Sequence, residues 1–85
     1  MTTLDKIIEI VAKQLKREPS EVTPDMDLAE AGYESLDVIE TIFEIEETWD
    51  LNIDFNANSE DADKFKTPAR IAATVDAMLA ARVSK

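Results

Sequence analysis

The sequence contains no cysteine and no histidine. The missing cysteine excludes a disulfide framework, a thiolate metal site and a cysteine nucleophile. The missing histidine excludes serine–histidine catalysis and histidine metal clusters, so we predict no catalytic residue and no metal site. No apolar run approaches the ~20 residues of a membrane span, and no signal-peptide pattern opens the chain. We therefore expect a cytoplasmic protein without a membrane span.

Lysine and arginine are absent between Glu18 and Asp63, a window that holds sixteen of the 19 acidic residues. The net charge of −10 argues against nucleic acid as a partner, because phosphates demand a basic surface. Solubility alone explains an acidic surface, but it does not explain why the charges are segregated. The segregation favours partner proteins with basic docking patches.

The 85 residues suit a single domain, residues 1–85, near the lower size limit for a self-sufficient core. Apolar residues at helical spacing predict a first helix that begins at Thr2 or Thr3 and ends before Pro19. A second helix is expected from about Ser35 to Trp49, and a last one begins at Pro68. A weaker signal predicts a short helix over residues 59–65, with Ala62 and Phe65 facing inward.

No strand has a partner to pair with, so the predicted fold is all-α, an irregular four-helix bundle with a long first loop. The loop covers residues 18–34, and Val22, Met26 and Leu28 are expected to pin it onto the bundle. Residues 27–31 are compatible with a single helical turn. The predicted core contains Leu4, Ile7, Val11, Leu15, Phe43, Trp49, Phe65, Val75 and Leu79.

The only glycine, Gly32, stands just ahead of the second helix, which predicts an unusual backbone conformation or a close approach there. Ser35 follows at the expected helix start, where a hydroxyl is exposed. Most serines at such positions only cap the helix, but Val38 stands where a capping box needs glutamate. The helix itself carries acidic residues and no base, namely Asp37, Glu40, Glu44, Glu46, Glu47 and Asp50.

The run Gly32-Tyr33-Glu34-Ser35-Leu36-Asp37 resembles the signature of acyl carrier proteins, in which a glycine and one or two further residues precede Asp-Ser-Leu at the head of an acidic second helix. The resemblance extends more loosely over nearly the whole chain. It implies a monomeric carrier, not an enzyme, with 4'-phosphopantetheine attached to Ser35. The flanking residues of this attachment site are Gly32, Glu34, Leu36 and Asp37.

The same resemblance implies a phosphopantetheinyl transferase that uses coenzyme A and Mg²⁺, and acyl synthases and transferases of fatty-acid, lipid or polyketide synthesis with basic docking patches. The docking surface would consist of Glu34, Asp37, Glu40, Glu44, Glu46 and Glu47. The resemblance further implies that acyl groups travel as thioesters and that the acyl chain folds back between the helices, against Leu36, Ile39, Ile42, Ile53 and Ile71. Glu34 in place of aspartate and the bulky Tyr33 favour a specialised member over the general fatty-acid carrier.

An alternative is a small acidic binding module that responds to calcium. Six polar residues fall at positions 1, 3, 5, 7, 9 and 12 of a calcium-loop template, namely Asp50, Asn52, Asp54, Asn56, Asn58 and Asp61. Against this interpretation, Phe55 occupies the position where the sharp turn needs glycine, and Asp61 replaces the longer glutamate.

Overall fold

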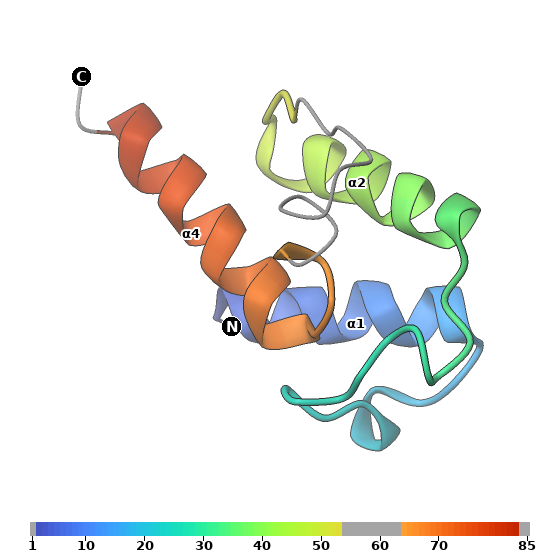
Figure 1. Ribbon diagram of the computed structural model, residues 1–85. Helices are drawn as coiled ribbons and strands as arrows, with labels where there is room; N and C mark the ends of the chain where they lie inside the picture. The colour runs from blue at the N-terminus through green and yellow to red at the C-terminus, as the bar shows by residue number, and fades with distance from the viewer. Residues whose placement is uncertain (1, 54–63, 84–85) are drawn as a thin grey trace.

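The computed structural model describes residues 2–53 and 64–83, and this part of the chain is helical and contains no strand (Figure 1). It comprises α1 (Thr3–Leu15), a short 3₁₀ helix η1 (Pro19–Glu21), α2 (Ser35–Trp49) and α4 (Pro68–Val83). The predicted all-α class and the three longer helices are confirmed. The predicted short helix falls largely on residues 54–63, which lie outside the described residues.

Helices α1 and α4 begin where their capping residues predict. The Asp5 backbone N–H donates to Thr2 Oγ1 at 3.1 Å, and the Thr2 N–H donates back to the Asp5 carboxylate at 3.3 Å. This reciprocal pair satisfies two backbone donors at the start of α1. At the start of α4, Thr67 Oγ1 accepts from the Arg70 N–H at 3.1 Å, and Pro68 takes the first helical position.

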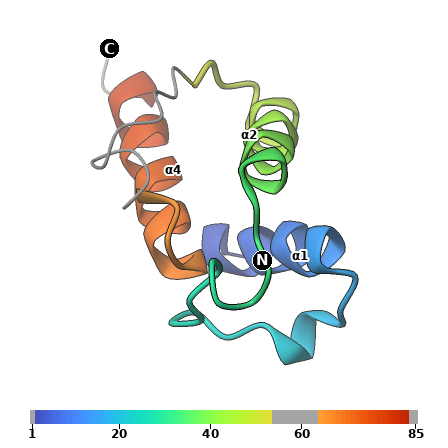
Figure 2. The same cartoon turned by 45° about the vertical axis from the view of Figure 1, so that its right-hand side comes forward.

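Helix α1 packs against both α2 and α4. In Figure 1, α2 lies above α1 and runs in the opposite direction, while α4 rises from the N-terminal end of α1; Figure 2 shows the same arrangement turned. A hydrogen bond of 2.6 Å from Thr3 Oγ1 to Asp76 Oδ1 joins α1 to α4. The buried core is made of Ile7, Ile10, Val11, Ala12, Val22, Leu28, Tyr33, Ile42, Ile45, Phe65, Ile71, Ala72 and Val75.

The long first loop is pinned to the bundle as predicted. Val22 and Leu28 are buried, and Met26 packs partly against the core. The backbone adds two bonds to the region where α4 begins: the Leu28 N–H donates to the Lys66 carbonyl, and the Ala69 N–H donates to the Pro24 carbonyl, each at 3.0 Å. Residues 27–31 make one helical-type bond, from the Ala31 N–H to the Asp27 carbonyl. The end of this loop is thereby fixed just before α2.

Helix α2 carries apolar residues on two faces, and only one of them is buried. Thr41, Ile42 and Ile45 are buried toward α1, whereas Phe43 is 59% exposed. The prediction that Phe43 belongs to the core is wrong. The helical repeat places Phe43 seven residues after Leu36, on the same side and well away from Ile45. Because a helix surrounded on one side can bury only one stripe, the second apolar stripe is left facing outward.

The calcium-loop alternative rests mainly on residues that are not described. Asp50 and Asn52 follow the end of α2, and the other four positions lie between residues 54 and 63. Over residues 2–53 and 64–83, no three acidic residues gather in a way that could hold a metal ion. A search of the same ranges finds no helix with the length and apolar character of a membrane span.

Candidate functional site

Ser35 is the first residue of α2 and is exposed to solvent. The N-cap is Glu34, in an extended conformation, so the interpretation of Ser35 as a mere capping residue is wrong. The Glu34 backbone N–H donates to Asp37 Oδ2 at 2.9 Å, and the Glu34 carbonyl accepts from the Val38 N–H. Within the described part of the chain, no hydrogen bond engages the Ser35 hydroxyl. Its oxygen is accessible to another protein.

Gly32 has a backbone φ of +109°, in the region that only glycine adopts readily. A Cβ atom built at this position would meet nothing within 4 Å. The sequence left two explanations for Gly32 open, an unusual backbone conformation and a close approach of another group. The structure supports the first and not the second. The turn is closed by the Tyr33 N–H, which donates to the Leu28 carbonyl at 2.9 Å. This turn connects the first loop to the start of α2.

The side chain of Tyr33 is buried directly beside the site, and its hydroxyl lies 2.5 Å from Thr41 Oγ1. Thr41 in turn donates to the Asp37 carbonyl oxygen at 2.8 Å. A carbonyl can only accept, so the single Thr41 proton is used there and the Tyr33 hydroxyl donates to Thr41. Burial disfavours the charged tyrosinate and raises the pKa of Tyr33 to about 12.

The environment of Ser35 fits an attached phosphodiester. The first backbone N–H groups of an α-helix have no partner within the helix, and the helix dipole places partial positive charge at this end. An anion bound covalently at the first helical residue is therefore stabilised by the backbone itself. The Asp37 carboxylate, the nearest acid along the helix, is held back by the Glu34 N–H.

The six acidic residues predicted for docking fall into two groups. Three make contacts within the chain: Asp37 with the Glu34 N–H, Glu44 with Lys13 Nζ at 2.8 Å, and Glu46 with the Ile53 N–H at 2.8 Å. The hydrogen bond and charge of Glu44 raise the pKa of Lys13. Helix α2 carries no basic residue of its own, but in the folded chain α1 supplies it with one, Lys13. The other three, all exposed, are Glu34, Glu40 and Glu47.

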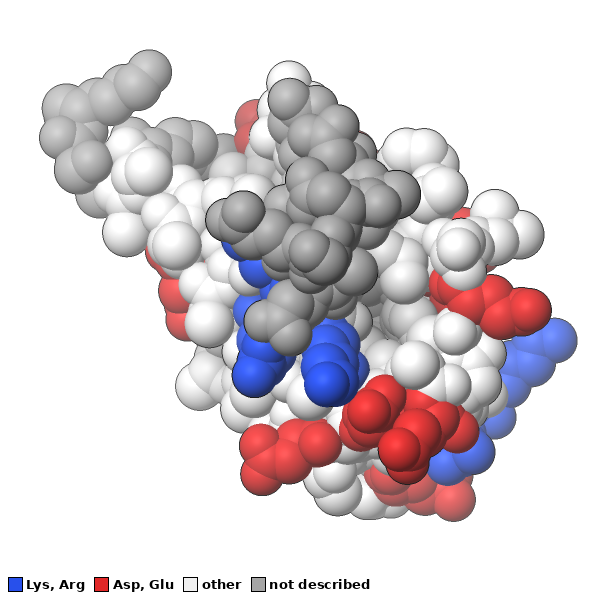
Figure 3. Space-filling view, viewed as in Figure 1, with Lys and Arg blue, Asp and Glu red and all other residues white. Residues whose placement is uncertain are grey.

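The charges are also less segregated on the surface than along the chain. On the face seen in Figure 3, acidic side chains gather low on the molecule, over the α1–α2 connection. Basic side chains form one group beside the start of α4 and a second at the right-hand edge, near the end of α1. Basic residues that lie outside the acidic stretch of the sequence are therefore close to the acidic side chains in the folded protein.

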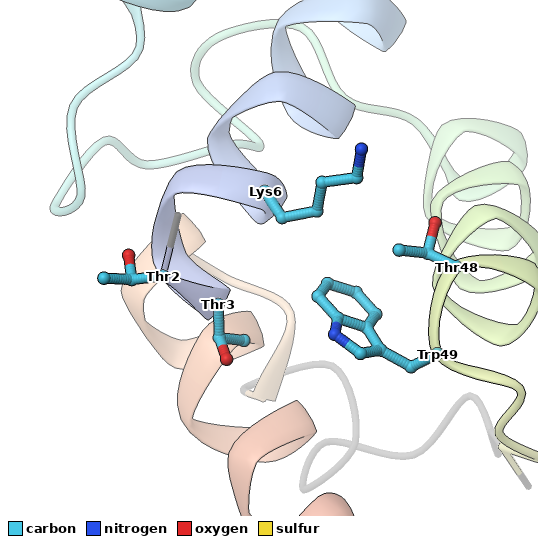
Figure 4. A pocket seen from close by; sticks show the side chains of 5 residues that line it. All are labelled: Thr2, Thr3, Lys6, Thr48 and Trp49. Carbon is cyan, nitrogen blue, oxygen red and sulfur yellow. The ribbon is translucent and has the colours of Figure 1, made fainter.

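The five residues predicted to cover an acyl chain occupy three different environments. Ile42 and Ile71 are core residues, Ile53 is half-buried, and Leu36 and Ile39 are 65% and 42% exposed. None of the five lines the pocket of about 240 Å³ in Figure 4, which is formed by Thr2, Thr3, Lys6, Thr48 and Trp49. That pocket lies at the opposite end of α2, about 20 Å from Ser35 along the helix axis.

A second pocket, of about 610 Å³, is lined by Asp5, Ile8, Glu9, Pro19 and Ser20 and also contains none of the five. The residues that sequence reasoning missed at the site are Thr41, which holds Tyr33, and Lys13, which pairs with Glu44. A signal for Thr41 existed, because its spacing from Val38 and Ile45 puts a polar residue on the apolar face.

Comparison with known proteins identifies the family. The family model described as "Phosphopantetheine attachment site" matches residues 5–75. A curated protein, "Acyl carrier protein" of Amoebophilus asiaticus (strain 5a2), is 33% identical over 76 residues, which cover 88% of this chain and 90% of that protein. The cofactor of this family is phosphopantetheine, and its members are carriers and not catalysts. Since both matches extend over most of the chain and include the Gly32–Asp37 signature, this protein belongs to the acyl carrier protein family.

Proposed function

We propose that Ser35 is the attachment point of 4'-phosphopantetheine and that the chain shuttles acyl groups between enzymes. The observation that carries this proposal is an exposed serine hydroxyl at the first position of α2 that takes no part in capping the helix. The cap of α2 is formed by the residues on both sides of Ser35, since the Glu34 N–H donates to the Asp37 carboxylate. The hydroxyl is thus left available for chemistry.

The attachment step transfers a phosphoryl group. The Ser35 oxygen attacks the phosphorus of coenzyme A that bears the pantetheine arm, a new O–P bond forms, and the bond to the bridging pyrophosphate oxygen breaks. Adenosine 3',5'-bisphosphate leaves, and the serine proton passes to a base. This base belongs to the transferase, because the chain has neither histidine nor cysteine and Tyr33 holds its proton up to a pKa of about 12.

When attached, the arm supplies a terminal thiol on which acyl groups are carried as thioesters. Leu36 and Ile39 lie within about one turn of Ser35 and offer the first apolar surface to such a cargo. Ile42 and Ile71 lie deeper, in the packed core, and Ile53, shortly after the end of α2, packs partly against it. An acyl chain that reaches Ile42 and Ile71 has to enter the packed core between the helices.

The proposed docking surface on α2 combines acidic side chains with exposed apolar side chains. Leu36, Ile39 and Phe43 are the large exposed hydrophobic residues of α2. Glu40 and Glu47 follow Leu36 and Phe43 by four residues each, so they lie beside this stripe. Glu34 and Asp37 adjoin Ser35, whereas Glu44 and Glu46 are partly occupied by Lys13 and the Ile53 N–H. Exposed ion pairs are individually weak, which suits enzymes that bind the carrier and then release it.

The absence of cysteine makes the proposal easy to test, because the protein has no thiol of its own. Incubation with coenzyme A and a phosphopantetheinyl transferase should convert a protein that is silent toward a thiol reagent into one that reacts once per chain. Ser35→Ala should abolish the reaction. Ser20→Ala is the matched control, since Ser20 is also exposed and lies in a short helix, η1. Retention of the thiol signal in Ser35→Ala would refute the assignment.

A further inference from the structure

A closed circuit of hydrogen bonds links the residues on both sides of Ser35. The Tyr33 hydroxyl donates to Thr41 Oγ1 at 2.5 Å, and Thr41 Oγ1 donates to the Asp37 carbonyl at 2.8 Å. The side chain of Asp37 accepts from the Glu34 N–H at 2.9 Å. Tyr33 and Glu34 are adjacent in the chain, so these bonds and the backbone form a ring. Ser35 lies between Glu34 and Asp37 in the sequence, so the ring holds the backbone on both sides of it.

The circuit is buried at its centre. Thr41 is fully buried, and Tyr33 is 9% exposed. Every buried side-chain polar atom in the described residues has a hydrogen-bond partner. A polar pair in a core is costly unless it is fully satisfied, and an apolar pair of the same shape would do equally well for packing. The pair therefore contributes something other than stability alone.

What the pair adds is orientation. The segment from Gly32 to Ser35 connects a turn with positive φ to the first turn of α2, and the side chains of Tyr33 and Asp37 anchor it to the helix. The Tyr33 ring fixes the position of this segment over the helix. The bonds to both the carbonyl and the carboxylate of Asp37 fix the direction in which α2 begins. Together they hold the backbone that carries Ser35.

We propose that Tyr33 and Thr41 are positioning residues for the modification of Ser35, and that their hydrogen-bond circuit presets the serine hydroxyl for attack on coenzyme A bound to the transferase. The inference rests on the proposed function of Ser35. Neither residue touches the reacting atoms. They act through the backbone on both sides of the serine, and preorganisation of a nucleophile in this way raises the rate of its reaction.

The test compares Tyr33→Phe, Thr41→Val and the double variant with the native chain. The rate is measured in a single turnover with coenzyme A and excess phosphopantetheinyl transferase, so that it reports the reaction of the bound complex. Unfolding by urea and helix content by circular dichroism are measured on the same samples. Thr74→Val is the control, because Thr74 Oγ1 makes the same type of bond, to the Arg70 carbonyl at 2.9 Å, on α4.

Each single variant should be modified about fivefold more slowly than the native chain, corresponding to the loss of one hydrogen bond from the preset geometry. Thr41→Val should also be less stable, since it leaves the buried Tyr33 hydroxyl without its acceptor. The double variant removes both polar groups and should regain stability, yet it should still be modified slowly. Thr74→Val should be modified at the native rate.

A rate that recovers together with stability in the double variant would overturn the proposal, because the pair would then be only structural. Native rates in both single variants would overturn it too. These results differ from a failure of the proposed function, in which the native chain itself is not modified.

Discussion

At the scale of single residues, Tyr33 is the most informative neighbour of Ser35. It is the only tyrosine in the chain, so its ionisation can be followed without interference from other tyrosines. Its ring fills part of the core, while its hydroxyl is held by Thr41. Burial disfavours the charged tyrosinate and raises the pKa in the folded state to about 12, from an ordinary value of 10.0.

This shift predicts a loss of stability at high pH. Below pH 10 both the folded and the unfolded chain keep the tyrosine proton, and the contribution of Tyr33 to stability is fully present. Between pH 10 and about 12 only the unfolded chain loses the proton, so the free energy of unfolding falls as the pH rises. Urea unfolding at a series of pH values measures this fall, and tyrosinate absorbance reports the pKa of the folded state.

Tyr33→Phe is the control, because lysine titration is common to both chains and only the tyrosine contribution is removed. A parallel decline in the two proteins over this range, or a folded-state tyrosinate that appears near pH 10, would contradict the assignment of Tyr33 as a buried donor.

Several features of the site could be predicted at this scale, and others could not. The unusual backbone of Gly32 and the exposed Ser35 follow from a lone glycine before a helix. The capping role of Glu34 could not be predicted, because glutamate is a poor N-cap residue. Here the helix start depends on the hydrogen bond that the Glu34 N–H donates to the Asp37 carboxylate. The partnership of Tyr33 with Thr41 depends on a tertiary contact that no local pattern specifies.

At the scale of helices, starts carry clearer local signals than ends. Threonine before α1 and Thr67-Pro68 before α4 are local signals that act within one turn. Helices α1 and α2 end at Leu15 and Trp49, and the C-cap residues that follow, Lys16 and Asp50, have φ of 58° and 53°. Glycine is the usual residue for this left-handed position, and the sequence has none there to mark it.

The cap of α4 gives a prediction at this scale. Thr67→Ala should lower the free energy of unfolding by about 1 kcal/mol, because the Arg70 N–H loses the bond to Thr67 Oγ1. Thr74→Ala serves as the matched control. It removes a threonine hydroxyl inside the same helix, where alanine has the higher helix propensity, so stability should be unchanged or rise by up to about 0.5 kcal/mol. Equal destabilisation by both changes would show that the cap has no special role.

The two apolar faces of α2 limited what could be predicted for this helix. Periodicity identified a helix from Ser35 to Trp49, but residues on both faces satisfied the apolar pattern. Only the packing of α1 against one side decides that Ile42 and Ile45 are buried and that Leu36 and Phe43 are exposed. For the same reason, some residues predicted to contact an acyl chain lie in the core and others lie on the surface.

At the scale of the whole molecule, folding partly offsets the charge segregation of the sequence. Lys13 from α1 reaches Glu44 on α2, and other basic residues lie at the margins of the acidic surface (Figure 3). Glu40 and Glu47 keep their exposure beside the apolar stripe of α2. The part of the acidic surface that is open to a basic partner is therefore narrower than the acidic window in the sequence.

This distribution predicts which acids matter for docking. Glu40→Gln should raise the KM of the carrier for the transferase, by less than about fivefold, because one exposed ion pair is worth under about 1 kcal/mol. The effect should fade as salt is added. Asp25→Asn removes one negative charge from the exposed first loop and should leave KM unchanged. An equal rise in both variants would mean that net charge, and not the α2 face, governs the encounter.

The central claim is that the exposed hydroxyl of Ser35 carries the arm, and peptide mapping by mass spectrometry tests it most directly. The native chain is incubated with coenzyme A and a phosphopantetheinyl transferase and then digested. We expect one added phosphopantetheine per chain, located on Ser35. A chain that stays unmodified while another acyl carrier protein is modified in the same mixture, or an added group on a different residue, would contradict it.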